Sequence, residues 1–202
     1  TVCEDIWEQG PARQAAEAGA SLLININASP FHLGKARERE LLVARRAAEH
    51  GFPIVYVNLV GGQDELVFDG GSFVVDAGGQ VVARLPFFGE TSQVVDIALE
   101  TRPRPLPAAC VPLLGEEEAV YGALVLGVRD YVRKNGFRGA VLGLSGGIDS
   151  ALTLAVAVDA LGAEQVEAVL MPSRYTAAMS NDDALAQARA LGFRVSDVTP
   201  GH

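Results

Sequence analysis

Eight consecutive residues combine glycines, hydroxyls and a carboxylate: Gly143, Leu144, Ser145, Gly146, Gly147, Ile148, Asp149 and Ser150. Glycines let backbone N–H groups approach a ligand closely, and the free N–H groups at the start of a following helix carry partial positive charge. The two serines add hydroxyl donors, and Asp149 is suited to hold a divalent cation beside a phosphate. The stretch therefore predicts a phosphate site, although a glycine-rich turn without a ligand would share its composition.

The elements expected around this stretch favour the phosphate site. An apolar run, Ala140-Val141-Leu142, predicts a buried strand before it, and Ala151 to Leu161 predicts a buried helix after it. No Lys follows the glycines, so the stretch is not a G-x-x-x-x-G-K-[ST] loop. It resembles the S-G-G-x-D-S pyrophosphate loop of the N-type ATP pyrophosphatases. That resemblance implies cleavage of ATP between its α and β phosphates, with AMP placed on a substrate carboxylate or carbonyl.

A second candidate for chemistry is Cys3, which follows a short strand remnant and is flanked by acids. A lone cysteine is more often a small buried hydrophobe than a nucleophile. Three motifs favour the nucleophile: C-E-D-I-W from Cys3, N-A-S-P-F-H-x-G-K from Asn27, and G-G-Q-D-E-x-V-F-D-G-x-S-F from Gly61. Together they resemble the nitrilase-fold glutaminase domain of glutamine-dependent NAD synthetases, which folds as an α-β-β-α sandwich.

The resemblance implies roles for individual residues. Cys3 matches the nucleophile, whose thiolate would attack the side-chain amide of glutamine and form a γ-glutamyl thioester. Glu4, Ser29 and Lys35 match positions that contact the amino-acid head of glutamine. A structural acid, a turn residue and a solvated helix-start lysine are the alternatives for these three. The family's Glu base and Lys lie upstream of its cysteine, so this stretch by itself is expected not to hydrolyse glutamine.

Bulk composition limits the kinds of partner. The 202 residues are 49% hydrophobic, enough for one large or two small cores, and carry a formal net charge of −9. That charge argues against a general nucleic-acid binder and against anionic membranes. The only cysteines, Cys3 and Cys110, form no disulfide framework, and no apolar run of membrane-spanning length occurs. We expect a cytoplasmic protein, cut out of a longer chain at both ends.

The first segment is expected to alternate helices and strands. Helices are predicted over 12–18 and 35–49, strands over 21–27 and 52–60, a loop over 61–65, and a hairpin turn over 76–79. In the second of these helices, Leu41, Ala44 and Ala48 lie on an apolar face opposite the charges. The proline-rich run 101–107 predicts an extended linker. The predicted domains are 1–100, a linker 101–115, and 116–202.

The second segment predicts alternating strands and helices. Helices are expected over 116–134, 151–161 and 180–191, and strands over 139–144, 166–171 and from 193. This order predicts a doubly wound parallel sheet, like that of the adenine nucleotide α-hydrolases, with its ligand at the carboxyl edge. The loop 172–176 follows the second strand and resembles a second ATP-contacting loop of NAD synthetases. Its Arg174 is an expected ATP contact, with a surface arginine as the alternative.

The order of the two blocks, both α/β, resembles glutamine-dependent NAD synthetase. The implied enzyme is a ligase in which ammonia from glutamine amidates adenylated deamido-NAD, with ATP and Mg²⁺ as cofactors and Asp149 as a metal ligand. A homo-oligomer acting on small molecules is expected, without nucleic acid or membrane. Two alternatives stay open: another glutamine amidotransferase of the ATP-pyrophosphatase class, and a non-catalytic nucleotide-binding fragment.

Overall fold

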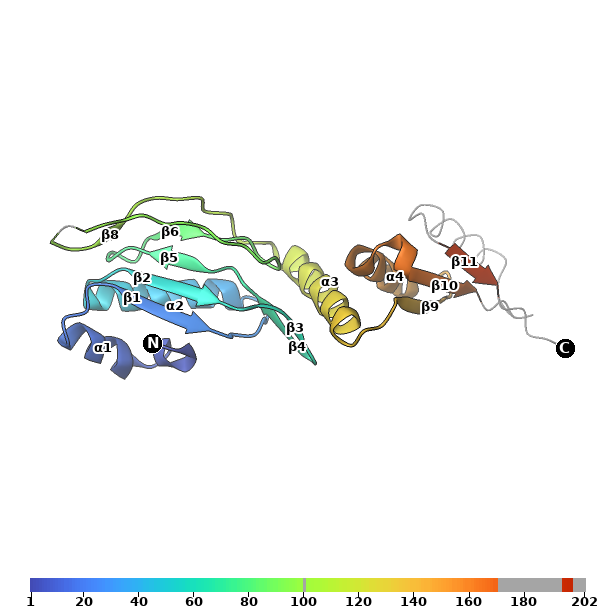
Figure 1. The fold of residues 1–202 in the computed structure, drawn as a ribbon, viewed down its shortest axis with the longest axis horizontal. Helices are drawn as coiled ribbons and strands as arrows, with labels where there is room; N and C mark the ends of the chain where they lie inside the picture. Colours follow the sequence, from blue (N-terminus) through green and yellow to red (C-terminus); the bar gives the residue numbers. More distant parts are fainter. Residues whose placement is uncertain (100, 171–193, 198–202) are drawn as a thin grey trace. The chain divides into compact units, whose positions relative to one another are not determined.

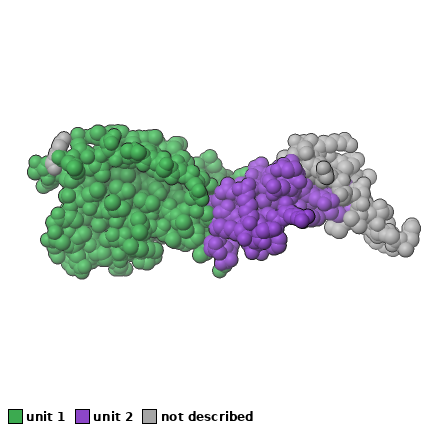
Figure 2. Space-filling model, viewed as in Figure 1, with its two compact units in different colours: residues 1–61, 65–123 green, residues 62–64, 124–202 purple. Residues whose placement is uncertain are grey.

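The computed structural model describes residues 1–99, 101–170 and 194–197. The chain forms two compact units, one of residues 1–61 and 65–123, the other of residues 62–64 and 124–202 (Figure 2). Both units contain helices and strands (Figure 1), and the predicted α/β class is confirmed. The predicted domain limits stay a prediction.

The first unit is built on a four-stranded mixed sheet in the order β1-β2-β5-β6. Its strands are β1 (Leu23–Asn27), β2 (Ile54–Asn58), β5 (Phe73–Val75) and β6 (Val81–Arg84). β1 and β2 are parallel, and β5 pairs antiparallel with both of its neighbours. The turn between β5 and β6 contains Asp76, whose carboxylate accepts hydrogen bonds from the N–H groups of Gly78 and Gln80. The predicted hairpin is confirmed.

Three helical segments share a core with this sheet: η1 (Cys3–Ile6), α1 (Gln9–Glu17) and α2 (Lys35–His50). Figure 1 shows α2 running alongside the strands. The core contains residues that are almost fully buried on each element, among them Ile6, Ala12, Val43, Ile54 and Val75. The two longer helices confirm the ones predicted over 12–18 and 35–49.

The predicted apolar face of α2 is wrong. Leu41 is 65% exposed and Ala48 is exposed, whereas the residues of α2 that are buried are Arg39, Val43, Arg46 and Ala47. The reason is that both guanidinium groups find hydrogen-bond acceptors inside the unit, which removes most of the cost of burying their charge. The helix is therefore turned so that a stripe with two arginines faces inward.

Two small two-stranded sheets are formed, one by residues 60–63 and 66–69 and the other by residues 97–98 and 104–105. Of the loop predicted over 61–65, residues 61–63 belong instead to β3 (Val60–Gln63), and residues 64–65 form the turn to β4 (Leu66–Asp69), with which β3 pairs. β7 (Ile97–Ala98) pairs with β8 (Arg104–Pro105). Within the proline-rich run, Arg104–Pro105 is extended as predicted, whereas residues 101–102 form a bend. The residues after the run are attached to β6 by backbone hydrogen bonds from Ala108 and Val111.

The second unit carries a parallel three-stranded sheet in the order β11-β10-β9, which confirms the predicted parallel arrangement. Its strands and helices are β9 (Ala140–Leu144), α4 (Ile148–Leu161), η2 (Ala163–Gln165), β10 (Val166–Leu170) and β11 (Arg194–Asp197), preceded by α3 (Glu116–Lys134), which begins in the first unit.

The helix α4 packs on this sheet through one side. Leu154, Ala157 and Leu161 are buried, but Ile148 is 80% exposed and Leu152 is 52% exposed, so the prediction of a helix buried all round is wrong. The loop 172–176, its Arg174, and the helix predicted over 180–191 lie outside the described residues. Over the described part of the chain, no helix combines the length and apolarity needed to cross a bilayer.

Candidate functional site

The thiol of Cys3 lies at the start of η1, directly after the point where Val2 pairs with Ile26 of β1. The backbone of Cys3 is left-handed, with φ of 50°. This conformation costs a non-glycine residue about 1–3 kcal/mol and needs support from its surroundings. Part of that support is visible, because the Asp5 carboxylate accepts a hydrogen bond of 2.9 Å from the Val2 N–H. The strained turn leaves the thiol half-buried.

A cavity of about 290 Å³ opens in front of this thiol. It is lined by Cys3, Glu4, Trp7, Asn27, Ala28, Ser29, Pro30, His32 and Lys35. All four residues that the sequence predicts for the glutamine site therefore share one cavity, hereafter the thiol cavity. Cys3 and Glu4 come from η1, Ser29 from the loop after β1, and Lys35 from the first position of α2. Because β1 and β2 are parallel, their carboxyl ends lie at the same edge of the sheet, and the loop after β1 begins there.

Ser29 belongs to a buried polar network that was not predicted from the sequence. Its hydroxyl accepts a hydrogen bond of 3.1 Å from Nε of Arg39, and its N–H donates to Oδ1 of Asn58 at 2.9 Å. Arg39 in turn donates two hydrogen bonds from Nη1 to the Asp69 carboxylate, at 2.8 and 2.9 Å. The one signal in the sequence was the presence of several arginines on α2. The groups that accept hydrogen bonds from Arg39 lie 10 and 30 residues away in the chain, at Ser29 and Asp69.

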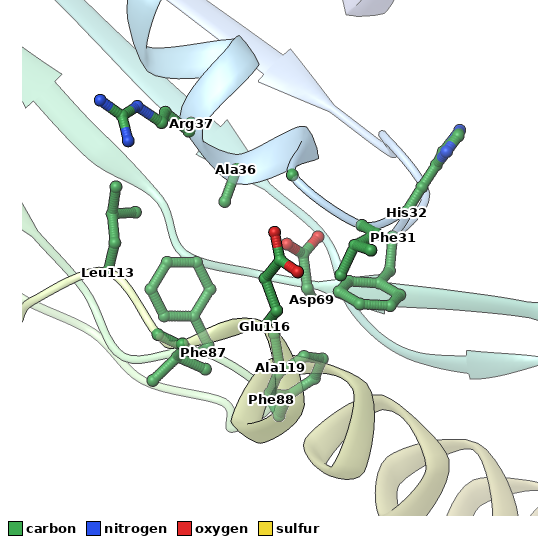
Figure 3. A pocket seen from close by; sticks show the side chains of 14 residues that line it. Phe31, His32, Ala36, Arg37, Asp69, Phe87, Phe88, Leu113, Glu116 and Ala119 are labelled. Atoms are coloured by element: carbon green, nitrogen blue, oxygen red, sulfur yellow. The ribbon is translucent and has the colours of Figure 1, made fainter.

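Asp69 lies 1% exposed at the end of β4. Burial raises the pKa of its carboxyl, and the guanidinium of Arg39 opposes that rise. On its other side Asp69 lines a second cavity of about 210 Å³, which shares His32 with the thiol cavity. Figure 3 shows this second cavity, with the rings of Phe31, Phe87 and Phe88 around it and Asp69 reaching it from the strand. Its wall is mainly apolar.

The predicted phosphate loop joins the carboxyl end of β9 to the start of α4. Gly146 has φ of 80°, a conformation that favours glycine, and Gly147 caps the helix. The hydroxyls of Ser145 and Ser150 lie 3.0 Å apart, and Oγ of Ser150 donates to the carbonyl of Gly147 at 2.9 Å. These bonds hold the loop closed on itself. The first N–H groups of α4 lack partners within the helix and point out of its start, as an anion site requires.

Asp149 lies exposed in the first turn of α4. Its carboxylate makes no hydrogen bond or ion pair with any described side chain, so it is available as a ligand. The described residues contain no cluster of three or more metal-binding side chains. A single carboxylate fits Mg²⁺, which keeps most of its waters and completes its shell with substrate phosphates.

Comparison with protein families divides the chain in two. The model of the carbon–nitrogen hydrolase family matches residues 1–103, and that of NAD synthase matches residues 120–200. The predicted resemblance is thus confirmed for both segments.

Comparison with single proteins gives matches over nearly the whole chain. It is 50% identical over 198 residues to the glutamine-dependent NAD(+) synthetase of Xylella fastidiosa and 48% identical to that of Rhodobacter capsulatus. Each match covers 98% of this chain and 36% of the relative, so the chain spans about a third of their length. The solved glutamine-dependent NAD+ synthetase of Acinetobacter baumannii, in complex with ADP, is 42% identical with a TM-score of 0.91, covering 97% of this chain and 38% of that one.

Proposed function

Because the chain belongs to the carbon–nitrogen hydrolase family, we propose that it is part of a glutamine-dependent NAD synthetase. This ligase would take ammonia from glutamine and use it to amidate deamido-NAD, with ATP converted to AMP and pyrophosphate. One observation carries the proposal: a single chain contains a thiol cavity followed by a phosphate loop, and it aligns with the relatives over nearly its whole length. Residues 1–100 would supply part of the first site and residues 116–202 part of the second.

At the first site, the thiolate of Cys3 attacks the amide carbon of glutamine. The left-handed backbone at Cys3 presents the thiol to the cavity, and the N–H of Glu4 is the donor best suited to the developing oxyanion. The amide nitrogen takes up the proton that the thiol has lost and leaves as ammonia, and water then releases glutamate from the thioester. The carboxylate of Glu4 suits the α-ammonium of the substrate, while Lys35 and the Ser29 hydroxyl suit its α-carboxylate.

At the second site, residues 143–150 would hold the phosphates of ATP. The two hydroxyl contacts within the loop preform it, so that binding does not have to order the backbone. Asp149 would hold Mg²⁺, which neutralises phosphate charge when it is bound. Arg174 is proposed as a further contact to ATP from the resemblance alone.

The remaining expectations are also proposals. The net charge of −9 supports small-molecule substrates rather than nucleic acid or an anionic membrane. Both cysteines are free, which supports a reducing cytoplasm. A homo-oligomer is proposed on the resemblance to the family.

The test measures NAD and AMP formation by the full-length protein with glutamine or with ammonium as the nitrogen source. Cys3→Ala is expected to abolish the glutamine-driven reaction and to keep the ammonium-driven one. Cys110→Ala is the matched control, because it removes the other cysteine, which is exposed and lies outside the thiol cavity. Loss of both reactions in Cys3→Ala, or retention of both, would overturn the proposal.

A further inference from the structure

Two arginines on the inner stripe of α2 are only 2% exposed, Arg39 and Arg46. We propose that they are positioning residues for amide hydrolysis, each holding one wall of the thiol cavity. Arg39 holds the wall that carries Ser29, which is proposed to bind the substrate's α-carboxylate, and Arg46 holds the wall that carries the thiol. This inference rests on the proposed function of the cavity and adds the two residues that fix its shape.

Arg39 fixes the wall formed by Ser29 and Pro30. Its Nη2 donates to the carbonyl of Ser29 at 3.0 Å and to the carbonyl of Pro30 at 2.9 Å. With the bond from Nε to the Ser29 hydroxyl and the two bonds to Asp69, all five N–H donors of the guanidinium are used. Both the backbone and the hydroxyl of Ser29 are therefore set by one side chain.

Arg46 fixes the wall of the cavity that is formed by Cys3, Glu4 and Trp7. Its Nη2 donates to the carbonyl of Trp7 at 2.8 Å, and its Nε donates to the carbonyl of Ile6 at 3.3 Å. Ile6 ends η1, whose first residue is Cys3, and Trp7 lines the cavity. A third bond, of 3.0 Å, joins Nη1 to Glu49 and orients the guanidinium. Arg46 thus anchors the short helical turn on which the strained thiol depends.

The spacing of the two arginines makes α2 a rigid spacer between the walls. Seven residues are about two helical turns, so both side chains leave the same face about 10 Å apart. Lys35 lies one turn before Arg39 on this face. Its side chain lines the cavity, and its ammonium group makes a cation–π contact with the Trp7 ring. One helix therefore sets the distance between the nucleophile and the two groups proposed to bind the substrate's α-carboxylate, Ser29 and Lys35.

A purely structural role does not require arginine at these positions. Replacing a buried ion pair by well-packed apolar side chains is often neutral or stabilising. Each arginine, by contrast, donates two directed hydrogen bonds to main-chain carbonyls. Such bonds fix the main chain to within the tolerance that catalysis needs, since misplacement by about 1 Å can lower the rate about 100-fold. The two arginines should therefore affect different kinetic constants, because they hold different walls.

The experiment compares Arg39→Lys and Arg46→Lys in the full-length protein, with glutamine hydrolysis, ammonium-driven NAD formation and thermal unfolding measured for each. Arg39→Lys is expected to raise KM for glutamine about tenfold or more with little change in kcat, whereas Arg46→Lys is expected to lower kcat about tenfold or more with little change in KM. Both should keep the ammonium-driven reaction. Arg45→Lys is the matched control, because Arg45 is the neighbouring residue with a side chain 60% exposed.

If a lysine variant does not fold, a substitution of its carboxylate partner takes its place. Asp69→Asn then tests Arg39, and Glu49→Gln tests Arg46, because each substitution weakens the hydrogen bonds that orient the guanidinium. The same shifts in KM and in kcat, respectively, are expected. The inference is overturned if the variants lower only the unfolding temperature, with kcat and KM of the folded protein unchanged, or if both change the same constant. Absence of glutamine hydrolysis in the unsubstituted protein would instead overturn the proposed function.

Discussion

The ammonium group of Lys35 lies 3.9 Å from the centre of the Trp7 ring, and 3.0 Å from a carboxylate oxygen of Glu38. The aromatic face and the carboxylate hold the charge at the wall of the thiol cavity, where the side chain is 21% exposed. A cation fixed in this way is ready to receive the carboxylate of an amino acid without further ordering.

Replacing Lys35 with Met should therefore weaken substrate binding. The loss of one charge-assisted hydrogen bond, about 1.5–3 kcal/mol, corresponds to an increase of about 10- to 150-fold in KM for glutamine. This KM is measured from steady-state glutamine hydrolysis by the full-length protein, with ammonium-driven NAD formation as the reference reaction. An unchanged KM would mean that Lys35 is only a solvated residue at the start of α2.

Replacing Asp149 with Ala should impair the second site alone. We expect NAD formation to fall about 100-fold or more with either nitrogen source, because a metal that neutralises phosphate charge contributes several kcal/mol to the transition state. Hydrolysis of glutamine at Cys3 should continue. A magnesium titration of AMP formation checks the role directly, and an unchanged magnesium requirement in Asp149→Ala would contradict it.

Gly146→Ala should distort the phosphate loop. Its φ of 80° costs an L-residue about 1–2 kcal/mol, and the strain falls on the backbone that is to meet the phosphates. We expect KM for ATP to rise about tenfold, measured with saturating ammonium. Gly10→Ala is the control, because Gly10 lies in α1 with open space around its Cα and should become neutral or slightly more stable. Equal effects of the two substitutions on KM for ATP would contradict the proposal that the loop binds the phosphates.

Tyr56→Phe should make the protein less sensitive to alkali. Tyr56 is 1% exposed, and burial raises the pKa of its hydroxyl above the usual value of about 10, with Arg39 opposing the rise. As the pH rises through 10, the unfolded chain loses this proton before the folded protein does, so the unsubstituted protein loses stability. Phenylalanine has no such proton.

The unfolding temperature of Tyr56→Phe relative to the unsubstituted protein should therefore increase above pH 10. At neutral pH the substitution should be neutral or stabilising, because the Tyr56 hydroxyl has no hydrogen-bond partner among the described residues. A difference in unfolding temperature that stays constant from neutral to alkaline pH would show that the hydroxyl does not titrate as burial predicts.

Local patterns allowed most of the fold to be predicted. The turn at 76–79 and the strand-loop-helix around Gly146 depend on residues close together in the chain, and both form where the sequence places them. The strand β3 was missed because its two glycines are typical of loops, and it is defined by pairing with β4.

The inner face of α2 could not be predicted for a related reason. Arginine is rarely buried, so a periodic pattern assigns Arg39 and Arg46 to the surface and Leu41 to the core. No local pattern connects the helix to the carbonyl groups that accept hydrogen bonds from the two guanidinium groups. They are those of Ser29, Pro30, Ile6 and Trp7. The candidate site was predictable residue by residue from family motifs, but the network that shapes it was not.

The most direct test of the account follows the nitrogen itself. The full-length protein would receive ATP, deamido-NAD, ammonium of natural isotope content and glutamine whose side-chain amide carries heavy nitrogen, and the NAD formed would be analysed by mass spectrometry. We predict that the NAD carries heavy nitrogen, and that Cys3→Ala forms NAD with natural nitrogen only. NAD without the label from the unsubstituted protein, or labelled NAD from Cys3→Ala, would contradict the account.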